Sequence, residues 1–382
     1  MFFHMTEGFD GLHENRRSFG IAVETRTDPA GPNEWRIRDE VVRLREWGTS
    51  IVHPLPPTRD TFIIGAADGC WLRLWDPAGR VSRKHAELTY SQRATWTISD
   101  LSKNGVHLDG ARVKSLPVPL VPGVQISIGG VTLIAESPLL CALRELLARF
   151  IGWSDEHCEA VDQVLYSVRV AATHREPLLL CGPGNLVSIA RLLHRHTFGD
   201  QPFVVYSPRA TYASGLEALA AAAGGTLCVW RNQQPADFDE VVAAVRGPAS
   251  RVSLVVCAHA FPRGNDIASQ IVTAFRSILL PSLADRAREL HRIIDAYAND
   301  AITTFGGWLA PADRDWIADN ASDTLTQIEV ATRRIIALHA CDESVTLAAK
   351  LLSVSHGSLS AWLARRALPG DSHIRLMDED EE

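Results

Sequence analysis

The spacing of apolar and polar residues changes in character several times along this chain. Residues 1–34 have no clear period and contain "DPAGPNE", which predicts a mobile N-terminal arm. From 35 to 136 the chain alternates in short runs such as "WTISDL" and "GVQISIGGVTLIAES", broken by Gly, Pro and Asp. A period of two residues with frequent turn residues predicts an antiparallel β-sandwich over residues 35–136.

After Ser137-Pro138 the apolar positions lie three and four apart, as in "LLCALRELLARFIGW", which predicts a helix. Apolar strands then alternate with helical segments up to residue 283: "EPLLLCG", "PFVVYS", "GTLCVW" and "SLVVCA". This alternation predicts an α/β domain with a parallel sheet over residues 137–283. Residues 284–330 are predicted to be helical, 331–369 to form a small helical unit, and 370–382, with "LMDEDEE", to be an acidic tail. The predicted fold class is therefore multidomain.

Length and composition agree with several globular domains. At 382 residues the chain is too long for one ordinary core. Its net charge of −7 argues against a protein that coats nucleic acid with its whole surface, but leaves room for a local basic patch.

The seven cysteines and the N-terminal sequence predict the compartment. The cysteines form no CxxC pair and have apolar neighbours, which indicates reduced core thiols in a cytoplasm and no metal site. The N-terminus "MFFHMTEGFDGLHENRRSFG" lacks the apolar run of a signal peptide, and no segment approaches about 18 apolar residues. We therefore expect a soluble cytoplasmic protein with no membrane contact.

Two short stretches of the predicted sandwich carry candidate chemistry: "GRVSRKHAEL" and, further on, "ISDLSKNGVHLDG". A phosphate dianion bound at a loop rim needs hydroxyl and charged donors. Ser82 offers a hydroxyl, and Arg83, Lys84 or Lys103 offers a positive charge. These stretches resemble the loops of the forkhead-associated (FHA) domain, which carry S-R-x-H and then D-x-S-x-N-G.

The resemblance covers about 100 residues and implies phosphothreonine recognition. It assigns Ser82, Arg83, Lys103 and Asn104 to phosphopeptide binding, and Gly65, His85, Ser102 and Gly105 to the support of the loops. One residue departs from the family, because Ala66 stands where an arginine usually binds the phosphate. Losing that donor costs about 1.5–3 kcal/mol, or roughly ten- to a hundredfold in affinity. The alternative is a sandwich that docks partners without phosphate.

The stretch "LLLCGPGNLVSIARLLH" has the layout of a phosphate-binding loop: a strand, then Gly182-Pro183-Gly184, then a helix. A loop that hydrolyses a nucleotide needs a lysine on the phosphates and an acid for magnesium. No lysine occurs between Lys114 and Lys350. The loop therefore lacks its catalytic part.

The surrounding residues resemble the AAA+ domain of bacterial sigma-54-dependent activators. The motifs that carry the resemblance are "ARLLH", the Pro202-Phe203 pair, "AAAAGGTLCVW" and "ILLPSLADRARELHRIIDAYANDAI". Trp230-Arg231 replaces the metal-binding Asp-Glu pair, and the GAFTGA loop is missing. The resemblance thus implies a degenerate AAA+ domain at 137–283 and a helical lid at 284–330, serving as a linker or as the platform of a homo-oligomer. Gly182 and Gly184 leave nucleotide binding without hydrolysis, or a residual ATPase, as alternatives.

The C-terminal "TRRIIALHACDESVTLAAKLLSVSHGSLSAWLARRAL" predicts three helices. The first ends near His339, "VTLAAKLL" is the second, and Ser353–Ser355 form a turn in which Ser355 caps the third. This plan resembles the Fis-type helix-turn-helix that ends the same activators.

That resemblance implies DNA binding by residues 331–369. It assigns Ser355, His356, Ser358 and Ser360 to the start of the recognition helix, and Lys350, Arg365 and Arg366 to DNA phosphates. Five Lys or Arg against two Asp or Glu in this segment predict weak binding by a monomer and a need for dimers. The alternative is a three-helix bundle that does not touch DNA.

Together the motifs predict a bacterial transcription regulator and not an enzyme, with no cofactor and no metal. Its expected partners are DNA and a phosphothreonine-containing protein from a Ser/Thr kinase pathway. The alternative is a phosphopeptide-binding signalling adaptor without DNA binding.

Overall fold

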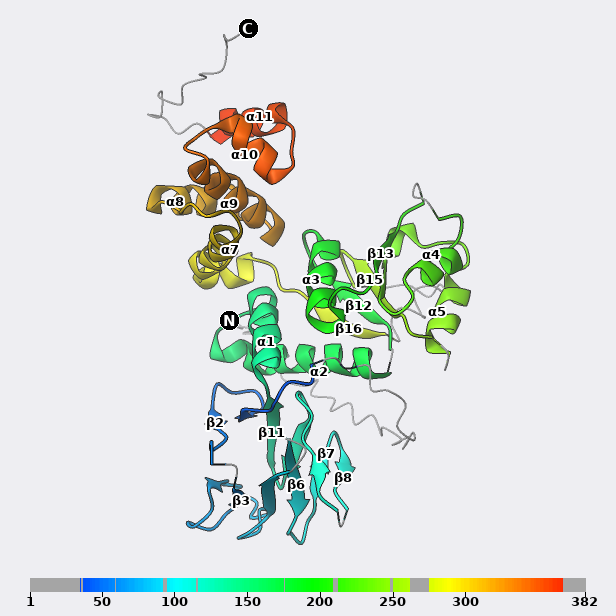
Figure 1. Ribbon diagram of the computed structural model, residues 1–382, viewed down its shortest axis with the longest axis vertical. Helices are drawn as coiled ribbons and strands as arrows, with labels where there is room; N and C mark the ends of the chain where they lie inside the picture. The colour runs from blue at the N-terminus through cyan, green and yellow to red at the C-terminus, as the bar shows by residue number, and fades with distance from the viewer. Residues whose placement is uncertain are drawn as a thin grey trace, which may run out of the picture. The chain divides into compact units, whose positions relative to one another are not determined.

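The computed structural model describes residues 35, 37–58, 60–91, 95–114, 116–174, 176–208, 212–247, 250–261 and 275–366 (Figure 1). The predicted N-terminal arm and the acidic tail lie outside the described residues. So do the last three residues of the predicted helix-turn-helix.

Two sheets form the N-terminal sandwich. The first has the strand order β2-β1-β11-β10-β7-β8 and the second the order β4-β3-β5-β6-β9. Neighbouring strands are antiparallel except for β3 and β4. The strands are β1 (Arg43–Glu46), β2 (Val52–Pro54), β3 (Thr61–Gly65), β4 (Leu72–Arg73), β5 (Ala86–Tyr90), β6 (Trp96–Asp100), β7 (Val106–Leu108), β8 (Ala111–Arg112), β9 (Val118–Pro119), β10 (Gln125–Ile128) and β11 (Val131–Glu136).

The core of the sandwich follows from the alternation in the sequence. Leu88 and Ile98 are buried on the paired strands β5 and β6, and Ile126 and Leu133 are buried on β10 and β11. Because side chains alternate between the two faces of a strand, the intervening polar residues are more exposed. The core thus holds the strands, while the loops between them can carry function.

Two helices, α1 (Pro138–Ile151) and α2 (Cys158–His174), follow the sandwich. Ser137 caps α1 by accepting the N–H of Leu140 at 3.2 Å, and Pro138 occupies the first turn. A short 3₁₀ turn, η1 (Asp155–His157), separates the two helices. Trp35 and Ile134 of the sandwich share one buried cluster with the apolar face of α1 and with residues of the parallel sheet.

A buried network of ion pairs joins the sandwich to α2. The Arg45 guanidinium lies 2.5 Å from one Asp162 oxygen and 2.6 Å from a Glu136 oxygen, and all three side chains are at most 1% exposed. Asp162 also accepts the N–H of Gly48 at 2.8 Å. Burial alone would lower the pKa of Arg45, but hydrogen bonds and charge from Asp162 and Glu136 outweigh burial and raise that pKa.

The central sheet is entirely parallel, with the order β13-β14-β15-β12-β16. Its inner strands are buried on both faces, which explains their continuous apolar sequences. The elements of this region are β12 (Leu178–Cys181), α3 (Leu186–Phe198), β13 (Phe203–Tyr206), α4 (Gly215–Ala221), β14 (Thr226–Trp230), η2 (Arg231–Gln233), α5 (Phe238–Arg246), β15 (Ser253–Ala258) and β16 (Arg276–Leu279).

The remaining described residues are helical. Thr324 and Gln327 form a capping box at the start of α9, and Ser353, in the left-handed region at φ 56°, ends α10. Three residues, Ser353–Ser355, connect α10 to α11. The elements are η3 (Ala284–Glu289), α7 (Leu290–Phe305), α8 (Pro311–Asn320), α9 (Leu325–Ala340), α10 (Val345–Leu352) and α11 (His356–Arg366).

Candidate functional site

His85 joins two loops at one end of the sandwich. Its ring is fully buried, and Nδ1 accepts the N–H of Ser82 at 2.9 Å. Because Nδ1 accepts, the neutral ring carries its proton on Nε2, which donates to the Gly105 carbonyl at 3.3 Å. His85 therefore holds the loop before β5 against the loop between β6 and β7.

A second set of hydrogen bonds shapes the loop after β6. The Ser102 hydroxyl donates to Asp100 at 2.7 Å and accepts the N–H of Gly105 at 2.7 Å. Burial alone would raise the pKa of Asp100, but the bonds from Ser102 and from the Val106 N–H hold that pKa below its usual value. Gly105 has a φ of +93°, and the Arg112 Nε lies 2.7 Å from the position of a Cβ there, so this turn requires glycine.

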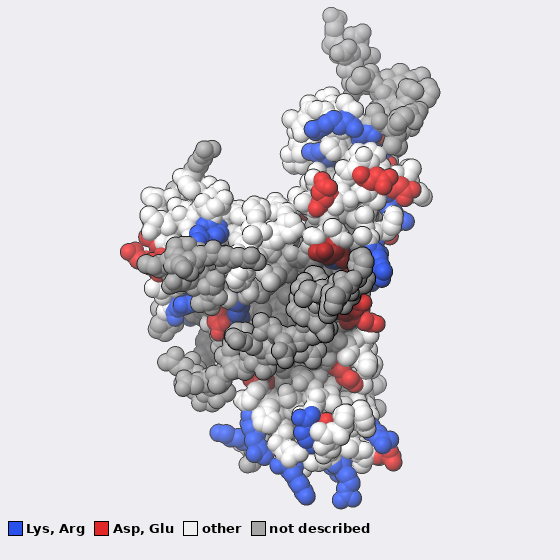
Figure 2. Space-filling view, turned by 180° about the vertical axis from the view of Figure 1, so that it is seen from behind, with Lys and Arg blue, Asp and Glu red and all other residues white. Residues whose placement is uncertain are grey.

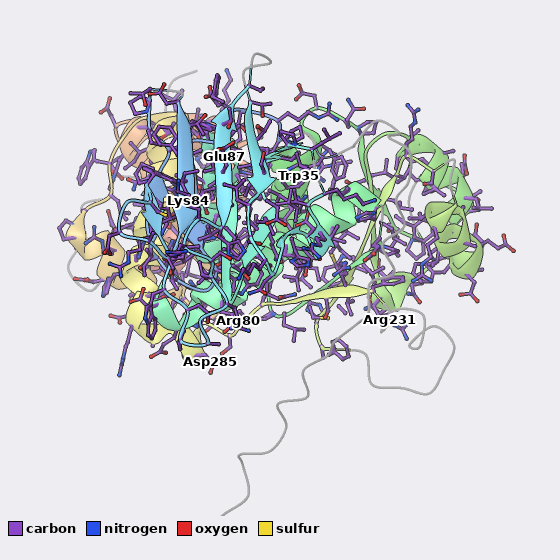
Figure 3. The ribbon with its side chains drawn as sticks, turned by 90° about the horizontal axis from the view of Figure 1, so that it is seen from below. Trp35, Arg80, Lys84, Glu87, Arg231 and Asp285 are labelled. Atoms are coloured by element: carbon purple, nitrogen blue, oxygen red, sulfur yellow. The ribbon has the colours of Figure 1, made fainter. Side chains whose placement is uncertain are left out.

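These supports bring together the predicted peptide-binding residues. The Ser82 hydroxyl lies 3.5 Å from the N–H of Lys103, and Asn104 donates to the Arg80 carbonyl at 2.8 Å. Arg83 and Lys103 are exposed and form no ion pair with any described residue. A hydroxyl, a backbone N–H and two side-chain cations thus gather at one loop end, an arrangement that can bind an oxyanion. Figure 3 labels Arg80 and Lys84 of this region.

The residues at the end of β3 also hold the loop that contains Ser82 and Arg83. The N–H groups of Ala66 and Ala67 donate to the carbonyls of Ser82 and Arg83, at 3.0 and 3.1 Å. A Cβ at Gly65 would lie 2.3 Å from the Arg83 carbonyl oxygen, so this close approach of two backbones needs glycine. Ala66 packs against the core and supplies no cation.

We expect Gly65→Ala to destabilise the chain by about 1–3 kcal/mol, because the backbone at Arg83 must move to admit the methyl group. Thermal unfolding of the variant would measure the loss. Gly69→Ala is the matched control, since nothing lies within 4 Å of its Cβ position and its φ is not positive. Equal midpoints for both variants would contradict the close packing at Gly65.

The predicted nucleotide loop comprises Gly182–Asn185, here called the glycine loop, between β12 and α3. The Gly182 N–H donates to the Ala258 carbonyl at 3.1 Å. The Asn185 N–H donates to the Thr326 hydroxyl of α9 at 3.0 Å, and the Asn185 side chain accepts the N–H of Ser188 at 3.3 Å. The N–H groups of Gly182 and Asn185, which could otherwise meet a phosphate, are therefore already bonded within the chain.

The predicted DNA-binding residues lie on α10 and α11. Ser355 caps α11 by accepting the N–H of Ser358 at 3.2 Å, and Ser360 lies 3.4 Å from the His356 ring through its hydroxyl. His356 and Ser358 are exposed, as are the predicted phosphate contacts Lys350 and Arg365.

Arg366, the third predicted phosphate contact, has partners within the chain. Its guanidinium pairs with Asp313 of α8 and lies 5.6 Å from the centre of the Trp316 ring. The side chain is only 14% exposed. Arg366 therefore holds α11 against α8, and its charge is already neutralised.

The sequence interpretation missed several residues that lie at or near the predicted sites. Asp100 lies in the quoted motif, and its spacing from Ser102 could have indicated the bond between them. Arg112 follows the Asp109-Gly110 turn of the β7–β8 hairpin, so the strand pairing could have suggested its position near the site. Asp313 and Thr326 gave no local signal. Within the described part of the chain, no three His, Cys, Asp or Glu side chains form a group that could hold a metal.

A scan against family models matches residues 62–129 to the FHA domain. The prediction of an FHA domain is thereby confirmed for this segment, and the chain joins it to a helical C-terminal region. Comparison with curated protein sequences finds no match. Across the described residues, no helix has both the length and the apolar character needed to cross a membrane.

Solved structures are similar to the chain over about a quarter of its length. EmbR of Mycobacterium tuberculosis, solved with a low-affinity phosphopeptide, is 27% identical, with 25% of this chain and 24% of that chain covered and a TM-score of 0.22. The N-terminal FHA domain of S. cerevisiae Rad53p, solved with a phosphothreonine peptide, is 20% identical, with 24% and 89% covered and a TM-score of 0.23. The FHA domain of CT664 from Chlamydia trachomatis is 23% identical, with 25% and 95% covered and a TM-score of 0.23.

Proposed function

We propose that the FHA domain of this chain binds a phosphothreonine segment of a partner protein in a Ser/Thr kinase pathway. The observation that carries the proposal is the juxtaposition of the Ser82 hydroxyl and the Lys103 N–H, held by the buried His85. A phosphate dianion has three strong acceptor oxygens, which suit a hydroxyl, an amide and nearby cations. Asn104 donates from its amide nitrogen to Arg80, so its Oδ1 can accept an N–H of the peptide backbone.

Two cations stand in for the arginine that is missing at Ala66. Lys103 comes directly after Ser102 in one loop, and Arg83 follows Ser82 in the other. Either side chain is available to an anion held at Ser82, because both are exposed and without an ion pair among the described residues. We therefore expect phosphate binding to survive the loss of the usual arginine.

The test is a titration of the full chain with a fluorescent phosphothreonine peptide library and with its unphosphorylated twin. The proposal expects anisotropy to rise with the phosphorylated library alone. Equal binding to both libraries would reject phosphate recognition and would leave a sandwich that docks its partners by other contacts.

We propose that the central region is a pseudo-ATPase that links the modules or supports a homo-oligomer. The glycine loop lies at the carboxyl end of β12, a strand between β15 and β16 in the parallel sheet. Ligands of parallel α/β sheets bind at the carboxyl ends of the strands, so this is where a nucleotide would be expected. This loop has no lysine and uses its Asn185 N–H on Thr326. We expect no magnesium-dependent ATP turnover by the full chain. We also expect calorimetry to detect no ATP binding. Turnover above background would overturn the proposal.

We propose that α10 and α11 bind DNA, which would make the chain a bacterial transcription regulator. Two helices joined by three residues, with an exposed start to the second, suit entry into the major groove. Arg365 and Lys350 are the exposed cations available for phosphates. Without nucleotide hydrolysis, such a regulator would act by binding alone.

We expect Arg365→Gln to weaken binding to genomic DNA fragments and to lower the slope of log K against log salt by about 1. The measurement is a salt series of DNA titrations with the full chain. Arg251→Gln is the matched control, because Arg251 is exposed but precedes β15 in the α/β region. An unchanged slope for Arg365→Gln would contradict its phosphate contact.

One observation favours the second candidate function, an adaptor that does not bind DNA. Arg333, Arg334 and Arg366 each lie over an aromatic ring of this chain, which lowers the number of free cations at the C-terminal helices. Burial and the charge of Arg365 also lower the pKa of Arg334. Failure of the wild-type chain to bind DNA at low salt would favour the adaptor.

A further inference from the structure

We infer that the phosphopeptide is acidic, with further Asp, Glu or phosphorylated residues on both sides of the phosphothreonine. This inference rests on the proposed phosphothreonine binding and specifies its substrate class. The evidence is the charge of residues 66–85 and 101–114, called the rim loops here, which surround Ser82 and Asn104.

The acids of the rim loops are all neutralised within the chain. Each of the three pairs with an arginine: Asp68 with Arg73 at 2.5 Å, Asp76 with Arg80 at 3.0 Å, and Asp109 with Arg169 at 2.7 Å. The bond from Arg80 holds the pKa of Asp76 at about 2 even though some burial opposes it. No acid of the rim loops is therefore left to neutralise an additional cation.

Five cations of the rim loops remain: Arg83, Lys84, Lys103, Arg112 and Lys114. All five are exposed, and none forms an ion pair with a residue that the structure describes. Figure 2 shows basic side chains projecting together from the sandwich at its lower end, although the chain as a whole carries −7. Unpaired like charges repel one another, so the rim favours an anionic partner.

The cations come from both loops that frame the candidate site. Arg83 and Lys84 directly follow Ser82, whereas Lys103 precedes Asn104 and Arg112 lies beside Gly105. A peptide held between Ser82 and Asn104 would therefore meet positive charge in both chain directions. A single phosphate can use only one or two of these cations, which leaves the others for neighbouring acids.

The test compares three peptides on the full chain by fluorescence anisotropy, at about 50 and about 200 mM salt. One has a phosphothreonine flanked by acids, one a phosphothreonine flanked by Ala and Gln, and one the acidic flanks with unmodified threonine. We expect the first to bind about tenfold more tightly than the second at the lower salt, with the difference shrinking at the higher salt. The third should bind weakly.

Substitutions then locate the preference. The Arg112→Gln, Lys114→Gln double variant should weaken binding of the acidic phosphopeptide much more than binding of the neutral one, and so narrow the gap between their affinities. Arg251→Gln, in the α/β region, should change neither. If the double variant kept the full preference for the acidic phosphopeptide, Arg112 and Lys114 would not be the source of that preference.

The outcomes separate the two proposals. Equal affinity for the acidic and neutral phosphopeptides would overturn the inference and leave phosphothreonine binding standing. Binding of none of the three would overturn both. If the unmodified acidic peptide bound as tightly as the acidic phosphopeptide, or if duplex DNA displaced that phosphopeptide as well as the unlabelled peptide does, the surface would bind polyanions in general. Either result would overturn the phosphopeptide assignment.

Discussion

An Asp162→Ala variant is expected to lose about 3–5 kcal/mol of folding free energy, because it removes one of the two carboxylates that neutralise the buried Arg45. Asp162 accepts hydrogen bonds from both terminal nitrogens of Arg45, at 2.7 and 2.5 Å, and from the Nε of Arg144, at 3.2 Å. Removal of the carboxylate leaves Arg45, 1% exposed, with Glu136 as its remaining acid partner. Urea unfolding followed by circular dichroism would measure the loss.

The matched control is Asp295→Ala. Asp295 pairs with Arg314 at 2.7 Å, but both side chains are about 40% exposed, so water can replace the lost partner. We expect a change of less than about 1 kcal/mol. Equal losses from the two variants would contradict the importance of the buried network that ties the sandwich to α2.

A Ser82→Ala variant is expected to lose roughly ten- to a hundredfold in affinity for a phosphothreonine peptide, because a hydrogen bond to a charged group is worth about 1.5–3 kcal/mol. The fold should survive, since the structural bond to His85 comes from the Ser82 backbone N–H and not from the hydroxyl. Anisotropy titration with wild type and variant would measure the ratio of dissociation constants.

Ser127→Ala is the control for that comparison. Ser127 is a half-buried serine on β10, in the other sheet of the sandwich, and pairs with His107 and Thr132 across the strands. We expect wild-type affinity from it. Wild-type affinity from Ser82→Ala as well would show that the Ser82 hydroxyl does not meet the phosphate.

The FHA sandwich was predictable because its signals are local. Alternation of apolar residues predicts each strand, and the two loop motifs lie within about 25 residues of each other. His85 lies where the motif requires it, between Ser82 and Gly105. The helical character of the C-terminal region was also visible, because its apolar spacing of three and four residues is local.

Two of the missed contacts join residues far apart in sequence. Arg366 meets Asp313 across 53 positions, and Asn185 meets Thr326 across 141. All four residues are of types common on protein surfaces, and no periodicity in the sequence marks either pair. The sequence therefore identifies Arg366 as a free cation, whereas folding uses its charge internally.

Phosphorus NMR of a phosphothreonine peptide, recorded with and without the full chain, observes the phosphate itself and so separates phosphate binding from other peptide contacts. We expect the phosphate resonance to shift and broaden with wild type and to return toward its free position with Ser82→Ala. A peptide that binds by anisotropy while its phosphate resonance stays unchanged would contradict phosphate recognition by this domain.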